Sequence, residues 1–113
     1  MTIYGVSQSS GLERRLNVER GASGIVLIIT DHRANEERER ILVPVDDLVA
    51  AITDPVSGGS VVEGVSPPHG AKMNLDVEVR RNEVLLVARG DGADVAVGLD
   101  DLQDALEGIL SRG

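Results

Sequence analysis

The chain has 113 residues and a formal net charge of −8, and it contains no cysteine, phenylalanine or tryptophan. This length suits one domain with an aliphatic core, and the lack of cysteine excludes a disulfide framework and thiolate chemistry. The acidic balance disfavours nucleic acid and anionic membranes as partners.

The sequence gives no sign of a membrane or export segment. The longest apolar run, residues 25–29, is much shorter than the roughly 20 residues of a membrane span. The first residues lack the basic start and apolar core of a signal peptide. We therefore expect a soluble, cytoplasmic protein, a location that also suits a chain without cysteine.

Three strands are predicted at the start of the chain. Residues 2–8 form a short strand, and residues 16–20 alternate apolar and polar side chains, as in a strand with one solvent-exposed face. The β-branched run 25–30 is apolar on both faces of the expected strand, which predicts a central strand covered on both sides.

A fourth strand and a helix complete the first half. The charged run 31–40 is interpreted as a solvated hairpin loop. Residues 40–45 form the strand, which must end or lie at a sheet edge because Pro44 lacks an N–H group. Asp46 is expected to cap a helix that Pro55 terminates.

The second half of the chain follows the same order. Strands are predicted near 61–66, 75–79, 84–87 and 94–99, before a longer helix that Asp100 caps. An apolar stripe at helical spacing follows Asp100 and is suited to packing on a sheet.

Short matches between the halves indicate an internal repeat. Residues 97–106 repeat the pattern of residues 43–52, and residues 5–7 and 64–66 both read Gly-Val-Ser. We predict an α+β fold: a duplicated ββββα unit with pseudo-twofold symmetry, in which antiparallel sheets pack against two helices. The predicted single domain, 1–113, divides into halves 1–55 and 61–113 with a linker at 56–60.

No residue pattern indicates catalysis, a metal or a cofactor, and we do not expect an enzyme. His32 and His69 are interpreted as surface-loop residues, because the sequence gives neither of them an orienting partner. The pairs Asp46-Asp47 and Asp100-Asp101 are more typical of helix starts than of metal or acid–base sites.

Basic residues on or beside the predicted strands are the candidates for contacts with phosphates. They are Arg14, Arg15, Arg20, Arg80, Arg81 and Arg89. The two halves do not share this basic pattern. Their predicted exposed face instead carries Glu19 in one half and Asp76 and Glu78 in the other.

Residues 75–89, followed by 95–102, resemble the hairpin, last strand and capped helix of a known group of single-stranded nucleic-acid-binding proteins. This group includes the PC4-like coactivators, the plant Whirly proteins and the PUR repeats. The resemblance implies sheets that bind single strands through basic and aromatic residues. This chain departs from that pattern because it is acidic and because only Tyr4 could stack on a base.

The leading functional hypothesis is a non-enzymatic protein-interaction module that self-associates, for example as a homodimer. One version is an acidic inhibitor or immunity-type protein that docks on a basic partner, since complementary charge speeds encounter. The alternative is single-stranded nucleic-acid binding of the PC4/Whirly kind, through the arginines named above. A small-molecule enzyme ranks third.

Overall fold

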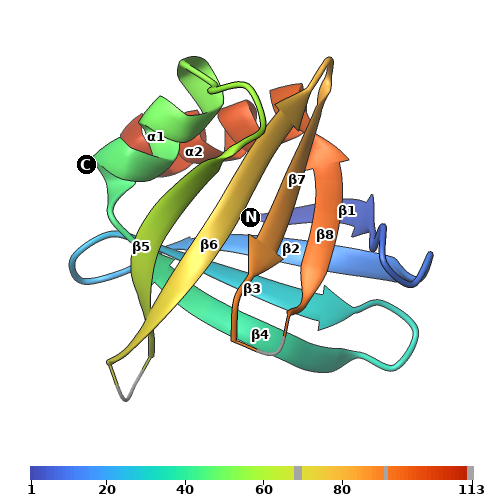
Figure 1. Ribbon diagram of the computed structural model, residues 1–113. Coiled ribbons are helices and arrows are strands. Elements are labelled where there is room, and N and C mark those ends of the chain that lie inside the picture. Colours follow the sequence, from blue (N-terminus) through green and yellow to red (C-terminus); the bar gives the residue numbers. More distant parts are fainter. Residues whose placement is uncertain (68–69, 91, 112–113) are drawn as a thin grey trace.

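The structure is a computed structural model that describes residues 1–67, 70–90 and 92–111 (Figure 1). Its elements, in chain order, are β1 (Thr2–Val6), β2 (Glu13–Arg20), β3 (Ile25–Asp31), β4 (Glu36–Val43), α1 (Val45–Thr53), β5 (Ser60–Ser66), β6 (Ala71–Arg80), β7 (Glu83–Ala88), β8 (Asp94–Gly98) and α2 (Leu99–Ser111).

The strands form one closed antiparallel barrel in the order β1 to β8, with β8 returning to pair with β1. In Figure 1, β2 to β4 lie across the view while β5 to β8 stand steeply, alternating in direction, and both helices lie toward the top. The predicted α+β fold of two repeated ββββα units, with sheets packed against helices, is therefore wrong. The closed barrel also gives no support to the PC4-like or Whirly-like architecture that the resemblance implied.

The physical reason for the barrel is that the strands cover one another. The first group of strands, β1 to β4, and the second group, β5 to β8, each have an aliphatic inner face. Each inner face buries the other across the barrel interior. Closure also pairs the outer strands of the two groups, which would be exposed edges in an open sheet. Alternation along a strand predicts that one face is buried, but it does not say what covers that face.

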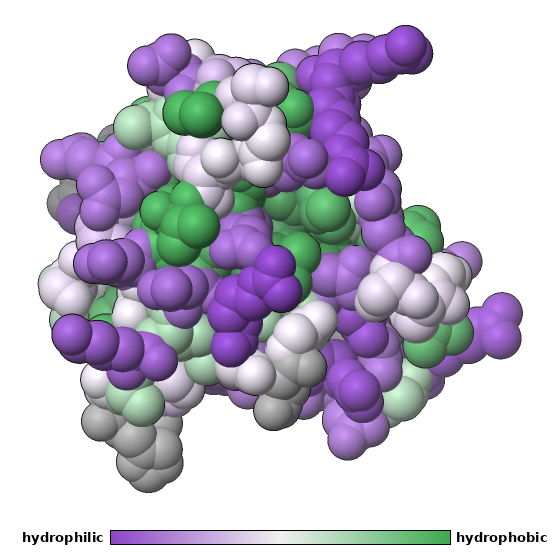
Figure 2. Space-filling view, in the orientation of Figure 1, coloured by the Kyte–Doolittle hydropathy of each residue, from purple (hydrophilic) through white to green (hydrophobic). Residues whose placement is uncertain are grey.

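Alternation along the strands separates the interior from the surface. Along β7, Val84, Leu86 and Ala88 are fully buried, whereas Leu85 and Val87 between them face outward and are half-buried. Figure 2 shows this outer side over β5 to β8, where hydrophobic residues interrupt a mostly hydrophilic surface.

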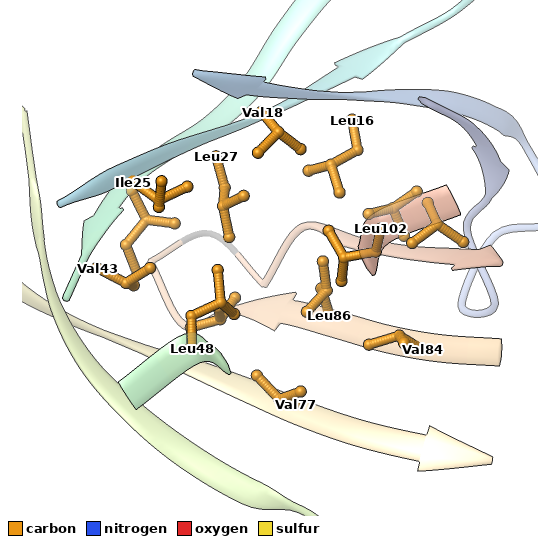
Figure 3. Close-up of a cluster of buried hydrophobic side chains, with 14 of the residues drawn as sticks. Leu16, Val18, Ile25, Leu27, Val43, Leu48, Val77, Val84, Leu86 and Leu102 are labelled. Carbon is orange, nitrogen blue, oxygen red and sulfur yellow. The ribbon is translucent and has the colours of Figure 1, made fainter. Parts of the chain in front are cut away.

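The core joins the barrel interior to the helices, which close one end of the barrel. Figure 3 shows Leu16, Val18 and Leu27 from one group of strands facing Leu86 from the other, with Leu48 of α1 and Leu102 of α2 directed inward between them. All of these side chains are less than 2 % exposed, so the core needs no aromatic residue.

The central position predicted for residues 25–30 is confirmed. This segment is β3, which pairs with β2 on one side and β4 on the other. On its outer face, Ile28 is only 5 % exposed and lies between Asn17 and Arg40 in register. Side chains of the two neighbouring strands, rather than a second layer of structure, therefore cover Ile28.

Several local predictions need correction. β4 begins at Glu36, so the loop predicted for 31–40 is shorter, because pairing with β3 extends the strand into charged, exposed residues. Asp46 is not the N-cap: Pro44 occupies that position, makes no side-chain cap and accepts the first helical bond through its carbonyl. Asp100 likewise lies inside the first turn of α2, where its charge still favours the positive end of the helix dipole.

The barrel closes through two narrow seams. One joins β1 to β8 and registers only Val6 with Ala96; the other joins β4 to β5 and registers only Leu42 with Val65. These contrast with the neighbouring hairpins, where pairing runs along whole strands. The seams are therefore where the barrel depends least on backbone pairing.

A glycine permits close backbone approach at each seam. A Cβ atom on Gly5 would lie 2.3 Å from the carbonyl oxygen of Ala96, and one on Gly64 would lie 2.6 Å from the carbonyl oxygen of Leu42. Both separations are too short for any other residue without movement of the backbone. The two matching Gly-Val-Ser triplets of the sequence thus lie at the two seams.

Candidate interaction surface

A buried polar cluster lies beside the β1/β8 seam, at the end of the barrel away from the helices. Its central residues are Asp94 and Arg14, which are 4 % and 6 % exposed. The Nη1 atom of Arg14 donates to the carbonyl oxygen of Asp94 at 2.8 Å and approaches its carboxylate at 3.3 Å. The Nε atom of Arg14 donates to Asp31 at 3.1 Å.

The loop after β1 supplies the other hydrogen bonds to Asp94. The hydroxyls of Ser7 and Ser9 donate to one carboxylate oxygen at 2.6 and 2.7 Å, and the backbone amides of Gln8 and Ser9 donate to the other at 2.9 and 3.1 Å. Burial alone would raise the pKa of Asp94, but these hydrogen bonds outweigh it and hold the pKa below its ordinary value.

This cluster, which we call the Asp94 latch, joins segments that are far apart in the chain through side-chain hydrogen bonds. Every donor around Asp94 is already bonded to it, and Ser7 is completely buried. His32 follows Asp31 in the chain and lines a shallow hollow with Arg14, and its ring packs against that of Tyr4. The latch therefore ties the start of β8 to β1 and β2 where backbone pairing is sparse.

Sequence reasoning missed the latch because its members are far apart in the chain. One signal was present: Arg14 shares the inward parity of Leu16 and Val18. A charged residue on the inner face of a strand implies a buried partner, because an unpaired buried charge is costly. The sequence does not identify that partner.

The six arginines proposed for phosphate contacts do not gather on one surface. Arg14 is enclosed in the latch. Arg80 and Arg89 face outward and donate to Glu78 at 2.7 Å and to Asp76 at 2.6 Å.

The remaining three arginines are also dispersed. Arg15 is half-buried and donates to the side chain of Asn35, whereas Arg20 and Arg81 are exposed, at the end of β2 and in the turn after β6. His69 lies outside the described residues.

Exposed apolar side chains form a strip across the outer face of the barrel. Leu85, Ala96 and Val6 lie side by side in register on β7, β8 and β1. Val87 extends the row along β7, and Tyr4 extends it along β1. We call these five residues the outer apolar strip; Tyr4 and Val6 are its most exposed members, at 67 % and 46 %.

Carboxylates border the outer apolar strip. Glu78 is opposite Leu85, Asp76 is opposite Val87, and Glu13 is opposite Val6 in register. Arg80 and Arg89 pair with two of these carboxylates, and Arg15 lies opposite Tyr4 at the other side of the strip.

Comparisons with family models, with curated proteins and with solved structures give no match for this chain. Among the described residues, no helix is long and apolar enough to cross a membrane. The same residues contain no group of three or more histidine, aspartate or glutamate side chains placed to hold a metal ion.

Proposed function

We propose that this protein is a non-enzymatic protein-interaction module that self-associates through the outer apolar strip. The supporting observation is the strip itself: apolar side chains that are continuous across three strands and stay accessible. Contiguous exposed apolar surface of this kind marks interaction sites in water-soluble proteins.

The energetic argument favours sheet-to-sheet contact. Each Å² of apolar surface removed from water contributes about 25 cal/mol, and Leu85 and Val87 project from β7, which pairs with β6 and β8 on its two sides. Ordering these side chains therefore costs little. The Arg80–Glu78 and Arg89–Asp76 pairs can remain as a polar rim, so that no charge needs to be buried unpaired.

The net charge of −8 favours a basic protein as a partner in addition to a second copy of the chain. An acidic surface accelerates encounter with a basic protein, as in inhibitors and immunity-type proteins that neutralise a basic target. We place this module in the cytoplasm, where a chain without cysteine loses nothing to reducing conditions.

Light scattering coupled to gel filtration tests self-association. Over a roughly hundredfold range of protein concentration, the mass should rise toward that of a dimer, because association follows mass action. Leu85→Asp should abolish this rise by placing a charge in the middle of the strip.

The matched control is Leu110→Asp. This leucine is also exposed, at 43 %, but it lies on α2 outside the strip, so its variant should associate like the native chain. A native protein that stays monomeric throughout the range would contradict the proposal.

A second candidate, single-stranded nucleic-acid binding, is favoured by one local arrangement. Tyr4 is the only aromatic residue of the chain, and its ring meets that of His32 edge-on at 5.5 Å. Arg15 is opposite Tyr4 in register on β2. An exposed aromatic ring beside an arginine can stack on a base while the cation contacts phosphate.

Labelled single-stranded oligonucleotides at low salt test this candidate. If it holds, binding should weaken steeply as salt is added, and Tyr4→Ala should weaken it by about 1–3 kcal/mol. Leu110→Ala is the control, since this exposed, uncharged residue lies on α2. No binding to the native protein at about 50 µM, a concentration that detects the weak non-specific class, would exclude it.

A further inference from the structure

The β4/β5 seam leaves one edge of β5 open. β5 pairs with β6 along its full length, Ser60–Ser66, but on its other side only Val65 is registered with β4. Within the described residues, no backbone hydrogen bond joins the rest of this edge to another element. The edge from Ser60 to Glu63 therefore presents unused N–H and C=O groups.

The free edges of β4 and β5 at this seam differ in the number of charged side chains that they carry. The start of β4 is charged at every position, from Glu36 to Arg40, and such charges prevent an edge from recruiting another strand. The edge of β5 reads Ser-Val-Val-Glu, with a single charge. Only the β4 edge is thus protected against strand addition.

A groove of about 440 Å³ runs between this edge of β5 and α1. Small apolar side chains, including Ala50 and Val61, line it, and Val61 is 62 % exposed. Three exposed carboxylates, those of Asp47, Asp54 and Glu63, stand along it. We call this feature the β5 groove.

We propose that the β5 groove binds a basic segment of a partner protein as an added strand. The open edge would supply backbone hydrogen bonds, which give such strand addition its affinity. Apolar side chains of the segment would face Val61 and Ala50, and its lysines or arginines would meet Asp47, Asp54 and Glu63. This inference rests on the proposed function, for which it names the chemistry of the partner.

The test uses a fluorescent peptide of alternating lysine and valine, followed by anisotropy against the native full chain. We expect saturable binding that a peptide of alternating glutamate and valine does not show. Two further peptides carry backbone N-methyl groups on alternate residues, one series on the valines and one on the lysines. Because alternate N–H groups of a strand point to opposite sides, only one series should lose binding.

Charge reversal in the groove provides the protein-side test. Each single variant, Asp47→Lys or Asp54→Lys, should weaken binding of the lysine–valine peptide several-fold, since an attractive charge becomes repulsive. Asp104→Lys is the matched control, because Asp104 is equally exposed but lies on α2. Its affinity should remain near the native value.

Several outcomes would overturn the inference: no saturable binding, equal binding of both unmethylated peptides, or indifference to both N-methyl series. If the Asp104→Lys control lost as much affinity for the peptide, the effect would come from net charge alone. A fall in the mass of the native protein on adding peptide would instead assign the edge to a second copy. Leu85 and Val61 line one hollow on the outer face, but Leu85→Asp is read out as the mass of the protein and the N-methyl peptides as strand pairing. Failure of self-association and failure of this inference therefore remain distinguishable.

Discussion

The two seams of the barrel have the same backbone contacts but differ in the side chains around them. At each, one residue pair bridges the strands, and a glycine allows the backbones to approach. Each seam serine also accepts a bond at 2.8 Å from the amide of a following glycine, as Ser7 does from Gly11 and Ser66 from Gly70.

Only the β1/β8 seam has a buried charge network. There, Ser7 is fully enclosed and donates to Asp94. Ser66, the last residue of β5, stays half-buried, and the open edge and the groove lie toward the start of the same strand. The comparison indicates that one seam secures closure through side chains, whereas the other leaves backbone groups available to a partner.

The largest expected effect comes from breaking the latch. Asp94→Ala removes one of the two carboxylates that the buried guanidinium of Arg14 contacts, the other being Asp31, and it removes the acceptor of four further donors. The free energy of unfolding should fall by about 3–5 kcal/mol, measured by urea denaturation. Asp104→Ala, at an exposed position of α2, should change it by no more than about 0.5 kcal/mol. A loss below about 1 kcal/mol for Asp94→Ala would assign closure of this seam to packing alone.

Adding a methyl group at each seam compares their rigidity. Gly5→Ala and Gly64→Ala should each lower the free energy of unfolding by about 1–3 kcal/mol. The loss should be greater for Gly5, whose added carbon meets a nearer carbonyl in a seam that the latch holds closed. Gly108→Ala is the control and should stabilise α2 by up to about 1 kcal/mol. Equal losses at both seams would contradict the difference in rigidity.

Acid should weaken the latched seam in particular. Because the folded-state pKa of Asp94 is lowered, its contribution to stability is fully present above the unfolded-state pKa and is lost as pH falls through the folded-state pKa. The unfolding free energy should therefore begin to fall below about pH 4, the ordinary range of an aspartate. Urea titrations at descending pH should show a shallower fall for Asp94→Asn, which cannot ionise. Parallel curves would show that other carboxylates carry the acid response.

The smallest effect on stability is expected at the charged edge of β4. Glu36→Val should change the free energy of unfolding by no more than about 0.5 kcal/mol, since the side chain is exposed. It should nevertheless promote slow, concentration-dependent association, because a charge that guards an open edge is lost. Static light scattering over time measures this, with Glu107→Val on α2 as the control. Identical behaviour of the two variants would show that the edge charges are not protective.

Local sequence patterns located the strands and helices but did not identify the functional surfaces. The alternation in residues 75–79, the apolar run 84–87 and the β-branched run 25–30 correspond to β6, β7 and β3. Nothing in such patterns predicts the β5 groove, because an open edge depends on where a neighbouring strand diverges. The outer apolar strip is likewise assembled from β7, β8 and β1, whose side chains become neighbours only after closure.

The sequence by itself determined the order of the strands and helices, the aliphatic character of the core and the acidic surface, because these follow from short-range periodicity and composition. Only the tertiary structure decided that the strands close on one another instead of against helices. It also decided that Arg14, a candidate for phosphate contacts, is enclosed with Asp94. The reason is physical: burial and pairing of charge depend on contacts between distant segments, and periodicity within one segment carries no information about its partner.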